Sequence, residues 1–287
     1  MKPRPAISRR AAALARLLLP AVLLLASGTS ALRLFRMRGD LRLTQAPPAR
    51  NMPPALAFGT IAFGGFRGIL ADFLWMRATD LQDRGRYFEL NQLAEWITRL
   101  QPRSPVVWSF QSWNLAYNIP ALLRDDAEKW RWVRHGILLL LDDGLRLNPA
   151  SAPLHADLAW LFLHKIGLDL DESAPYYRAR LAESPPDALD PAACRAVETA
   201  LGVPLDWSTP QAHAIYWATA GLPFARTPAE DLSLRRIRYQ ALLQLVAAGD
   251  ALYRAPAIDA VRETLARHPG NPALRRLLPT LEAAPAP

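Results

Sequence analysis

The chain has 287 residues, 51% of them hydrophobic, and a net charge of +8, so it can bury a core and is not a disordered polypeptide. Residues 1–50 carry ten basic residues against one acidic residue, +9, which leaves −1 for the rest of the chain. A nucleic-acid footprint should lie on the folded part, so nucleic acid is not an expected partner. Cys194 is the only cysteine, which excludes an intramolecular disulfide and a paired-cysteine metal site.

The amino-terminal segment has the pattern of a secretory signal or a membrane anchor. A basic tail at 1–16 precedes an uncharged apolar run from Leu17 to Leu32. That run would extend ~24 Å as a helix, and snorkelling of its flanking arginines supplies the rest of a ~30 Å hydrocarbon core. We therefore expect a transmembrane anchor at 17–35, in contact with membrane lipid.

Cleavage of this segment after Ala31 is the alternative, because Thr29 and Ala31 form a small-x-small pair. Arginines follow that position immediately and hinder translocation, which favours an uncleaved anchor. Basic residues are slightly more numerous before the run than just after it. This bias favours a cytoplasmic amino terminus, with the rest of the protein on the periplasmic side of the inner membrane.

A basic, proline-rich linker is predicted at 36–54, ending in the sequence QAPPARNMPP. The apolar stretch that follows, Ala55–Phe66, is too short to span a bilayer. We expect it to pack as a helix on the next helices. Contact with the membrane surface is the alternative.

Small, aromatic and proline residues recur between Ala71 and Pro149 at the offsets of a helix-turn-helix unit of about 34 residues. The first unit ends at Pro102, and one face of its second helix carries Tyr87, Leu90, Ala94 and Ile97. The matching positions before Pro149 are Ile137, Leu141 and Gly144. The two prolines lie 47 residues apart, about 13 more than one period, which predicts an insertion around Asn118–Glu128. Its acidic residues are expected to form a charged loop that caps the next helix, namely Asp125, Asp126 and Glu128.

This pattern resembles the tetratricopeptide repeat (TPR), which implies a solenoid of stacked helix pairs that binds polypeptides rather than catalysing a reaction. Segments such as GRYFE and LAWLFLHKIG are similar to a group of membrane-anchored bacterial TPR proteins; the resemblance supplies an architecture and no activity. The predicted fold is all-α, with TPR-like repeats over 55–182. A third unit would have Phe162 on its first helix and Ala174 in its second. Arg77 and Gln111 occupy positions where the repeat prefers large apolar residues.

The remaining chain also reads as helical, with no strand pattern of useful length. Prolines over 183–210 predict loops around short helices. Degenerate helical repeats are expected over 211–280, with one helix in PQAHAIYWATAGL and another ending near Gly249. Residues 281–287 are expected to form a tail.

No catalytic residue, cofactor site or metal site is predicted. His155 and His164 are nine residues apart, which at ~100° per residue places them on opposite sides of a helix. Asp142 and Asp143 diverge in the same way and are expected on a solvated face. Cys194, like Ser173, has no histidine near it in sequence to complete a nucleophile–base pair.

The resemblance implies that the first helix of each unit lines a concave groove. The groove positions are Trp75, Thr79 and Asp83 in unit one, Ser109, Trp113 and Tyr117 in unit two, and Ala156, Trp160 and His164 in unit three. Aromatic side chains with polar tips suit an extended or helical peptide. The alternative is a groove filled by the protein's own carboxy-terminal helices, through Ile215 and Tyr216.

The sequence thus predicts a membrane-anchored scaffold of the bacterial cell envelope that binds a protein or peptide partner. One alternative is a structural subunit of a membrane complex that docks through Ala55–Phe66. The other is an accessory enzyme or hydrolase whose site lies in the loops of 183–210.

Overall fold

The computed structural model describes residues 27–30, 33, 37, 67–186 and 188–283. The chain divides into two units, Met1–Pro53 and Pro54–Pro287. Most of the predicted anchor and linker, and all of Ala55–Phe66, lie outside the described residues. None of the helices within the described ranges is both long and apolar enough to cross a bilayer, so the anchor stays a prediction.

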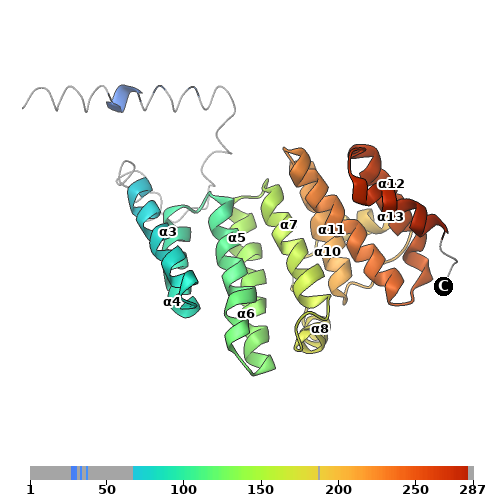
Figure 1. Cartoon of the computed structure of the whole chain (residues 1–287), viewed down its shortest axis with the longest axis horizontal. Helices are drawn as coiled ribbons and strands as arrows, with labels where there is room; N and C mark the ends of the chain where they lie inside the picture. The colour runs from blue at the N-terminus through green and yellow to red at the C-terminus, as the bar shows by residue number, and fades with distance from the viewer. Residues whose placement is uncertain (1–26, 31–32, 34–36, 38–66, 187, 284–287) are drawn as a thin grey trace, which may run out of the picture. The chain divides into compact units, whose positions relative to one another are not determined.

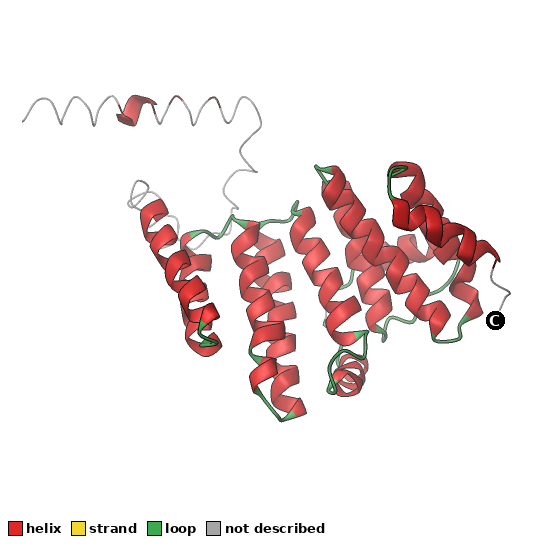
Figure 2. Ribbon diagram, viewed as in Figure 1, coloured by secondary structure: helices red, strands yellow, loops and turns green. Residues whose placement is uncertain are grey.

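All regular structure among the described residues is helical, which confirms the predicted all-α class (Figures 1 and 2). Three π-helical segments continue α5, α6 and α7, and three short 3₁₀ turns lie between other helices. The elements are α3 (Arg67–Asp83), α4 (Tyr87–Leu100), α5 (Pro105–Trp113), η1 (Asn114–Asn118), η2 (Pro120–Leu122), α6 (Asp126–Leu138), η3 (Leu139–Leu145), α7 (Ala152–Trp160), η4 (Leu161–Ile166), α8 (Ala174–Glu183), α9 (Pro191–Leu201), α10 (Pro210–Gly221), η5 (Leu222–Phe224), α11 (Pro228–Ala247), η6 (Ala251–Tyr253), α12 (Arg254–Arg267) and α13 (Pro272–Ala283).

Prolines mark the beginnings of many of these helices. A proline occupies the first or second position of α5, α7, α8, α9, α10 and α11, where its fixed φ suits the helix and its missing N–H costs no hydrogen bond. Polar side chains cap the amino termini of several helices. The Ser151 hydroxyl accepts from Leu154 N–H at the start of α7, and Thr227 and Glu230 form a capping box at the start of α11. These prolines therefore mark where helices begin and do not prevent helix formation.

The first helices form the contacts that their apolar spacing predicts. Leu90, Ala94 and Ile97 are buried on α4, which packs between α3 and α5. The indole N–H of Trp108 donates to the carbonyl oxygen of Pro102 at 2.9 Å, and the Asn148 amide donates to the same oxygen at 3.0 Å. The end of α4 is therefore tied to both α5 and the chain that follows η3.

The insertion predicted around Asn118–Glu128 mainly lengthens two helices. η1 continues α5 to Asn118, η2 follows, and α6 already begins at Asp126. Asp125 caps α6 by accepting from Glu128 N–H at 2.8 Å, as expected. A Cβ at Gly136 would lie 3.0 Å from the Ser112 carbonyl oxygen, so this glycine lets α6 approach α5 closely.

The helix packed along α7 is α10, and this corrects the expectation that the helix at Ala174 plays that role. α8 does begin at Ala174, but it contacts η4 and α6 at the lower end of this region (Figure 1). α10 contacts α7, η4 and α11, and a Cβ at Gly221 would lie 2.6 Å from His155 Cβ. Residues 167–209, with α8 and α9, thus separate two helices that pack together.

Polar and charged residues stabilise two further positions in the core. Gln111 is buried at a position expected to be apolar; its amide N–H donates to the Asn91 side-chain oxygen at 2.8 Å, while its buried Oε1 has no partner. Arg235 on α11 is buried between Asp231 at 2.8 Å and Glu263 of α12 at 2.6 Å. At the carboxy terminus α13 continues to Ala283, so the helix extends into the segment expected to be a tail.

Candidate functional site

Two helices present matching stripes of side chains to each other. Ser109, Trp113 and Tyr117 follow one face of α5 and η1 at intervals of four residues. Asp157, Trp160 and His164 follow one face of α7 and η4. The stripes meet at both ends, because Ser109 Oγ donates to Asp157 Oδ2 and the Tyr117 hydroxyl lies 3.2 Å from His164 Nδ1.

Four of these side chains form a continuous aromatic row, defined as Trp113, Tyr117, His164 and Trp160. Trp113 stacks on Tyr117 with ring centroids 4.1 Å apart and planes 21° from parallel. Trp160 stacks on His164 at 4.4 Å and 20°. Tyr117 and His164 join the two stacks at 5.9 Å.

The π-helical segments help to align the row. In an α-helix, residues four apart differ in direction by ~40°, since each residue advances ~100°. Tyr117 lies in η1 and His164 in η4, where the i→i+5 pattern of a π-helix turns the chain less per residue. Each side chain therefore stays closer to the direction of the tryptophan four residues before it.

The row is uncharged near neutral pH and partly open to solvent. Burial raises the pKa of the Tyr117 phenol, although a hydrogen bond with Trp160 opposes this. Burial and the neighbouring Lys165 charge lower the pKa of His164. Trp113 leaves 48% of its surface exposed, and the other three side chains are half-buried. The row is thus a neutral, partly exposed aromatic surface.

The other predicted groove residues do not join the row. Trp75 packs edge-on against Phe110 at 4.9 Å, and its indole N–H donates to Gln101 at 3.5 Å. Thr79 is exposed and donates to the Trp75 carbonyl of its own helix, while Asp83 is exposed at the end of α3. Ala156 is half-buried beside Asp157.

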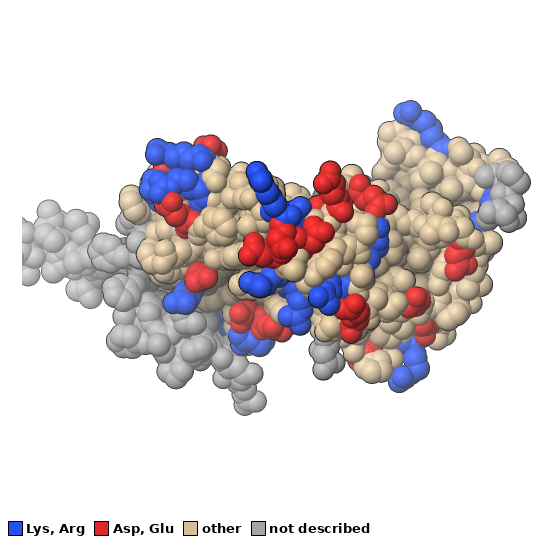
Figure 3. All heavy atoms as spheres, turned by 90° about the horizontal axis from the view of Figure 1, so that it is seen from below, with Lys and Arg blue, Asp and Glu red and all other residues tan. Residues whose placement is uncertain are grey.

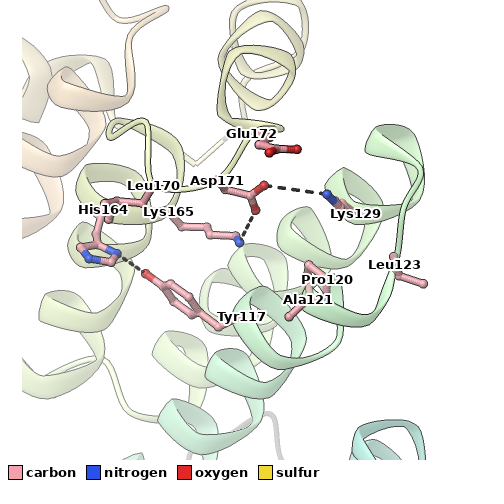
Figure 4. A pocket seen from close by; sticks show the side chains of 10 residues that line it. All are labelled: Tyr117, Pro120, Ala121, Leu123, Lys129, His164, Lys165, Leu170, Asp171 and Glu172. Atoms are coloured by element: carbon pink, nitrogen blue, oxygen red, sulfur yellow. Dashed lines mark hydrogen bonds and ion pairs between the residues drawn. The ribbon is translucent and has the colours of Figure 1, made fainter.

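A hollow of about 420 Å³ borders Tyr117 and His164 on one side (Figure 4). Lys129 of α6 and Lys165 of η4 line it, with Asp171 between them (Figure 4). Lys165 is 9% exposed and lies 2.7 Å from Asp171 Oδ2, and its ammonium group lies 5.3 Å from the centre of the Tyr117 ring.

The charged side chains that line this hollow are joined by hydrogen bonds, directly or through Ser173. Burial raises the pKa of Asp171, but hydrogen bonds from Lys165, Ser173 N–H and Tyr177, with the Lys165 charge, outweigh it and lower the pKa to about 2. Lys129 donates to Ser173 Oγ at 3.0 Å, and that hydroxyl donates to Asp126 at 2.6 Å. The network fastens the segment before α8 to η4 and α6, which is a structural role.

A second, more apolar hollow of about 340 Å³ borders the other side of His164. Trp160 and Leu163 face Leu243 and Gln244 of α11 across it. Tyr216 lies elsewhere: its hydroxyl accepts from Asp190 N–H at 3.1 Å, and its ring contacts Trp217 at 4.9 Å.

Polar side chains in 183–210 hold its turns together. Glu198 accepts from Leu205 N–H and from the Trp207 indole, both at 3.0 Å. Asp206 accepts from Ser208 N–H at 3.0 Å. Cys194 is buried, and burial raises the pKa of its thiol, which disfavours the reactive thiolate.

His155 lies in the core on the other side of α7 from the aromatic row. Its ring lies 5.4 Å from Phe224 and 6.1 Å from Trp217, and Nδ1–H donates to the Ser151 carbonyl at 2.8 Å. Burial lowers its pKa. Within the described ranges, no group of three or more His, Cys, Asp or Glu side chains is arranged to hold a metal ion.

Sequence reasoning did not single out Lys165 or Asp171, and it considered Asp157 only as a rejected metal ligand between His155 and His164. Asp157 precedes Trp160 by three residues, and this spacing on a helix was the available signal for a shared face. Lys165 interrupts the apolar sequence LFLHKIG, where a buried charge requires a partner. That partner, Asp171, follows η4 in the chain, and the turn of the chain after η4 brings it to Lys165.

Comparison with known proteins found no family model, no curated protein and no solved structure that matches the chain.

Proposed function

We propose that this protein is a membrane-anchored scaffold of TPR-like helical repeats that binds a polypeptide through the aromatic row. The observation that carries the proposal is the pair of stacks, Trp113 on Tyr117 and Trp160 on His164, on two adjacent helices with Trp113 half exposed. Tryptophan and tyrosine combine a large apolar area with a polar tip, and such residues dominate the binding energy of many interfaces.

The order of helix contacts supports the repeat interpretation. α3 packs with α4, α4 with α5, and α5 with α6 and α7; after the excursion of 167–209, α7 packs with α10 and α11, and α11 with α12. In a helical-repeat protein each helix pair contacts its neighbours in this sequential way. The third pair would then consist of α7 with α10, and the fourth of α11 with α12.

The distribution of charge favours a polypeptide partner over a nucleic acid, and the hydrogen bonding in 183–210 does not favour a hydrolase site there. Basic and acidic side chains are interspersed on the face in Figure 3, whereas a nucleic-acid footprint needs a basic field. In the segment 183–210 proposed for a hydrolase, Glu198 of α9 and Asp206 accept hydrogen bonds that hold its turns.

The test compares Trp113→Ala with Trp96→Ala in the full chain. Both tryptophans are 48% exposed, but Trp96 lies on α4 outside the row. Polypeptides captured from detergent-solubilised membranes are identified by mass spectrometry for each variant. We expect one polypeptide to be lost with Trp113→Ala and retained with Trp96→Ala; equal capture by both variants would reject the row as the binding surface.

The membrane anchor and its orientation are part of the same proposal and rest on the sequence. In native membranes the protein should keep its full 31.9 kDa mass, and a reporter fused after Pro287 should be active only in the periplasm. A soluble form beginning at Leu32 would establish cleavage instead.

A further inference from the structure

Asp157 is a carboxylate without a charged partner at one end of the aromatic row. Among the described residues, its hydrogen-bond partner is the Ser109 hydroxyl, which donates to Oδ2. In the described part of the chain no ion pair joins Asp157 to a lysine, arginine or histidine. Burial raises its pKa and the Ser109 hydrogen bond opposes this, so the negative charge is only partly stabilised by the protein itself.

Asp171, near the other end of the two stripes, has several partners of its own. Lys165 lies 2.7 Å from it, and Tyr177 and Ser173 N–H both donate to it at 3.0 Å. The same Lys165 ammonium group lies over the ring of Tyr117. One end of the stripes therefore already combines an aromatic ring, a cation and a carboxylate, whereas the Asp157 end has a carboxylate, with the two tryptophans one turn away, and no cation.

The helix geometry places both tryptophans of the row one turn from Asp157. Trp160 follows Asp157 by three residues, and Trp113 follows Ser109 by four, so both tryptophans lie one helical turn from the Ser109–Asp157 contact. Indole rings are the strongest cation–π partners among the side chains, so a cation bound at Asp157 would have two of them within one helical turn.

We propose that the polypeptide partner presents a cationic side chain to Asp157, against the tryptophans of the row, and that arginine fits this position best. The planar guanidinium group binds a carboxylate through parallel N–H donors and stacks on aromatic rings, whereas an ammonium group is compact and more strongly hydrated. This inference rests on the proposed function, because it names the partner residue that the row would recognise.

The test uses N-acetyl-L-argininamide as the probe and N-acetyl-L-citrullinamide as its neutral analogue of nearly equal shape. The full chain, in detergent and labelled with ¹⁵N-tryptophan, is titrated with each compound while the indole N–H resonances are followed. Trp113 and Trp160 are assigned from their single substitutions. We expect the arginine probe to shift both resonances saturably and to bind at least about tenfold more tightly than the citrulline probe.

Two variants with the same loss of charge separate a local site from a general electrostatic effect. Asp157→Asn should weaken binding of the arginine probe about tenfold, while Asp142→Asn, at an exposed position in η3, should leave it unchanged. Equal binding of the two probes, or equal effects of the two variants, would overturn the inference. If Asp157→Asn does not fold, the comparison of the two probes on the unaltered chain still decides.

The outcomes also separate this inference from the proposed function. Equal binding of the probes together with Trp113-dependent capture of a polypeptide would reject only the cationic residue. Capture that does not depend on Trp113 would reject the proposed function itself.

Discussion

Two aromatic–histidine stacks have nearly equal geometry but differ in exposure: one is fully buried and the other is partly open to solvent. Phe162 stacks on His213 at 4.6 Å and 22°, and Trp160 stacks on His164 at 4.4 Å and 20°. Phe162 and His213 are 0% and 1% exposed, whereas Trp160 and His164 are half-buried and border two hollows. Stacking alone therefore does not identify a candidate binding surface. The exposed fraction of the rings distinguishes the two stacks.

The buried stack also perturbs the hydrogen bonding and the pKa of its histidine, His213. His213 Nε2–H donates to the Trp207 carbonyl at 3.0 Å, and its buried Nδ1 has no partner. Burial lowers the pKa of His213 to about 4, and the bond to Trp207 only partly opposes this. His164, by contrast, bonds Tyr117 of the adjacent helix, so its stack links the two helices of the candidate site.

The largest expected effect comes from breaking the buried stack. Phe162→Ala removes a fully buried ring from the contact between η4 and α10, and such truncations cost about 3–5 kcal/mol through lost burial and the cavity left behind. Chemical denaturation, followed by circular dichroism, measures the change in the free energy of unfolding. A loss below about 1 kcal/mol would contradict the assignment of Phe162 to the core.

The second effect is a pH dependence contributed by His213. Its pKa is about 4 when folded against an ordinary value of 6.5, so between these values the unfolded chain binds the proton more readily. The contribution to stability is complete above pH 6.5 and is lost as the pH falls through 4, amounting to about 3 kcal/mol.

His213→Gln removes the titration at that position while keeping an N–H donor. Unfolding free energies of both proteins, measured between pH 7 and pH 4, should converge as the pH falls. Parallel curves across this range would contradict a neutral, buried His213.

The smallest expected effect is on the stability of the open row. Trp113→Ala removes an exposed ring that stacks on Tyr117, and such a stack contributes about 0.5–1.5 kcal/mol. The equally exposed Trp96→Ala serves as the control in the same denaturation experiment. A loss of about 3–5 kcal/mol, as for a buried tryptophan, would place Trp113 in a groove filled by the protein itself.

Helical periodicity was enough to predict the all-α class and the approximate extents of α10 and α11. The stripes Ser109–Trp113–Tyr117 and Trp160–His164 could be read in the same way, because residues about four apart share a helix face. Opposite directions for His155 and His164 follow from the same arithmetic, and the structure places His155 in the core.

Features that depend on long-range packing could not be derived from local pattern. α7 and α10 pack together although 167–209 separates them, and a repeat of fixed length leads instead to the nearer helix at Ala174. Nothing in the composition of the π-helical segments marks them. The link between Lys165 and Asp171 depends on how the chain turns after η4.

The most direct test of the open aromatic row is site-specific photo-crosslinking in native membranes. A photoreactive benzoylphenylalanine replaces Trp113 in one protein and the equally exposed Trp96 in another. The account predicts that light crosslinks a distinct polypeptide to position 113 and not to position 96. A crosslink of equal yield at both positions, or none at position 113 in membranes where the protein is folded and abundant, would contradict it.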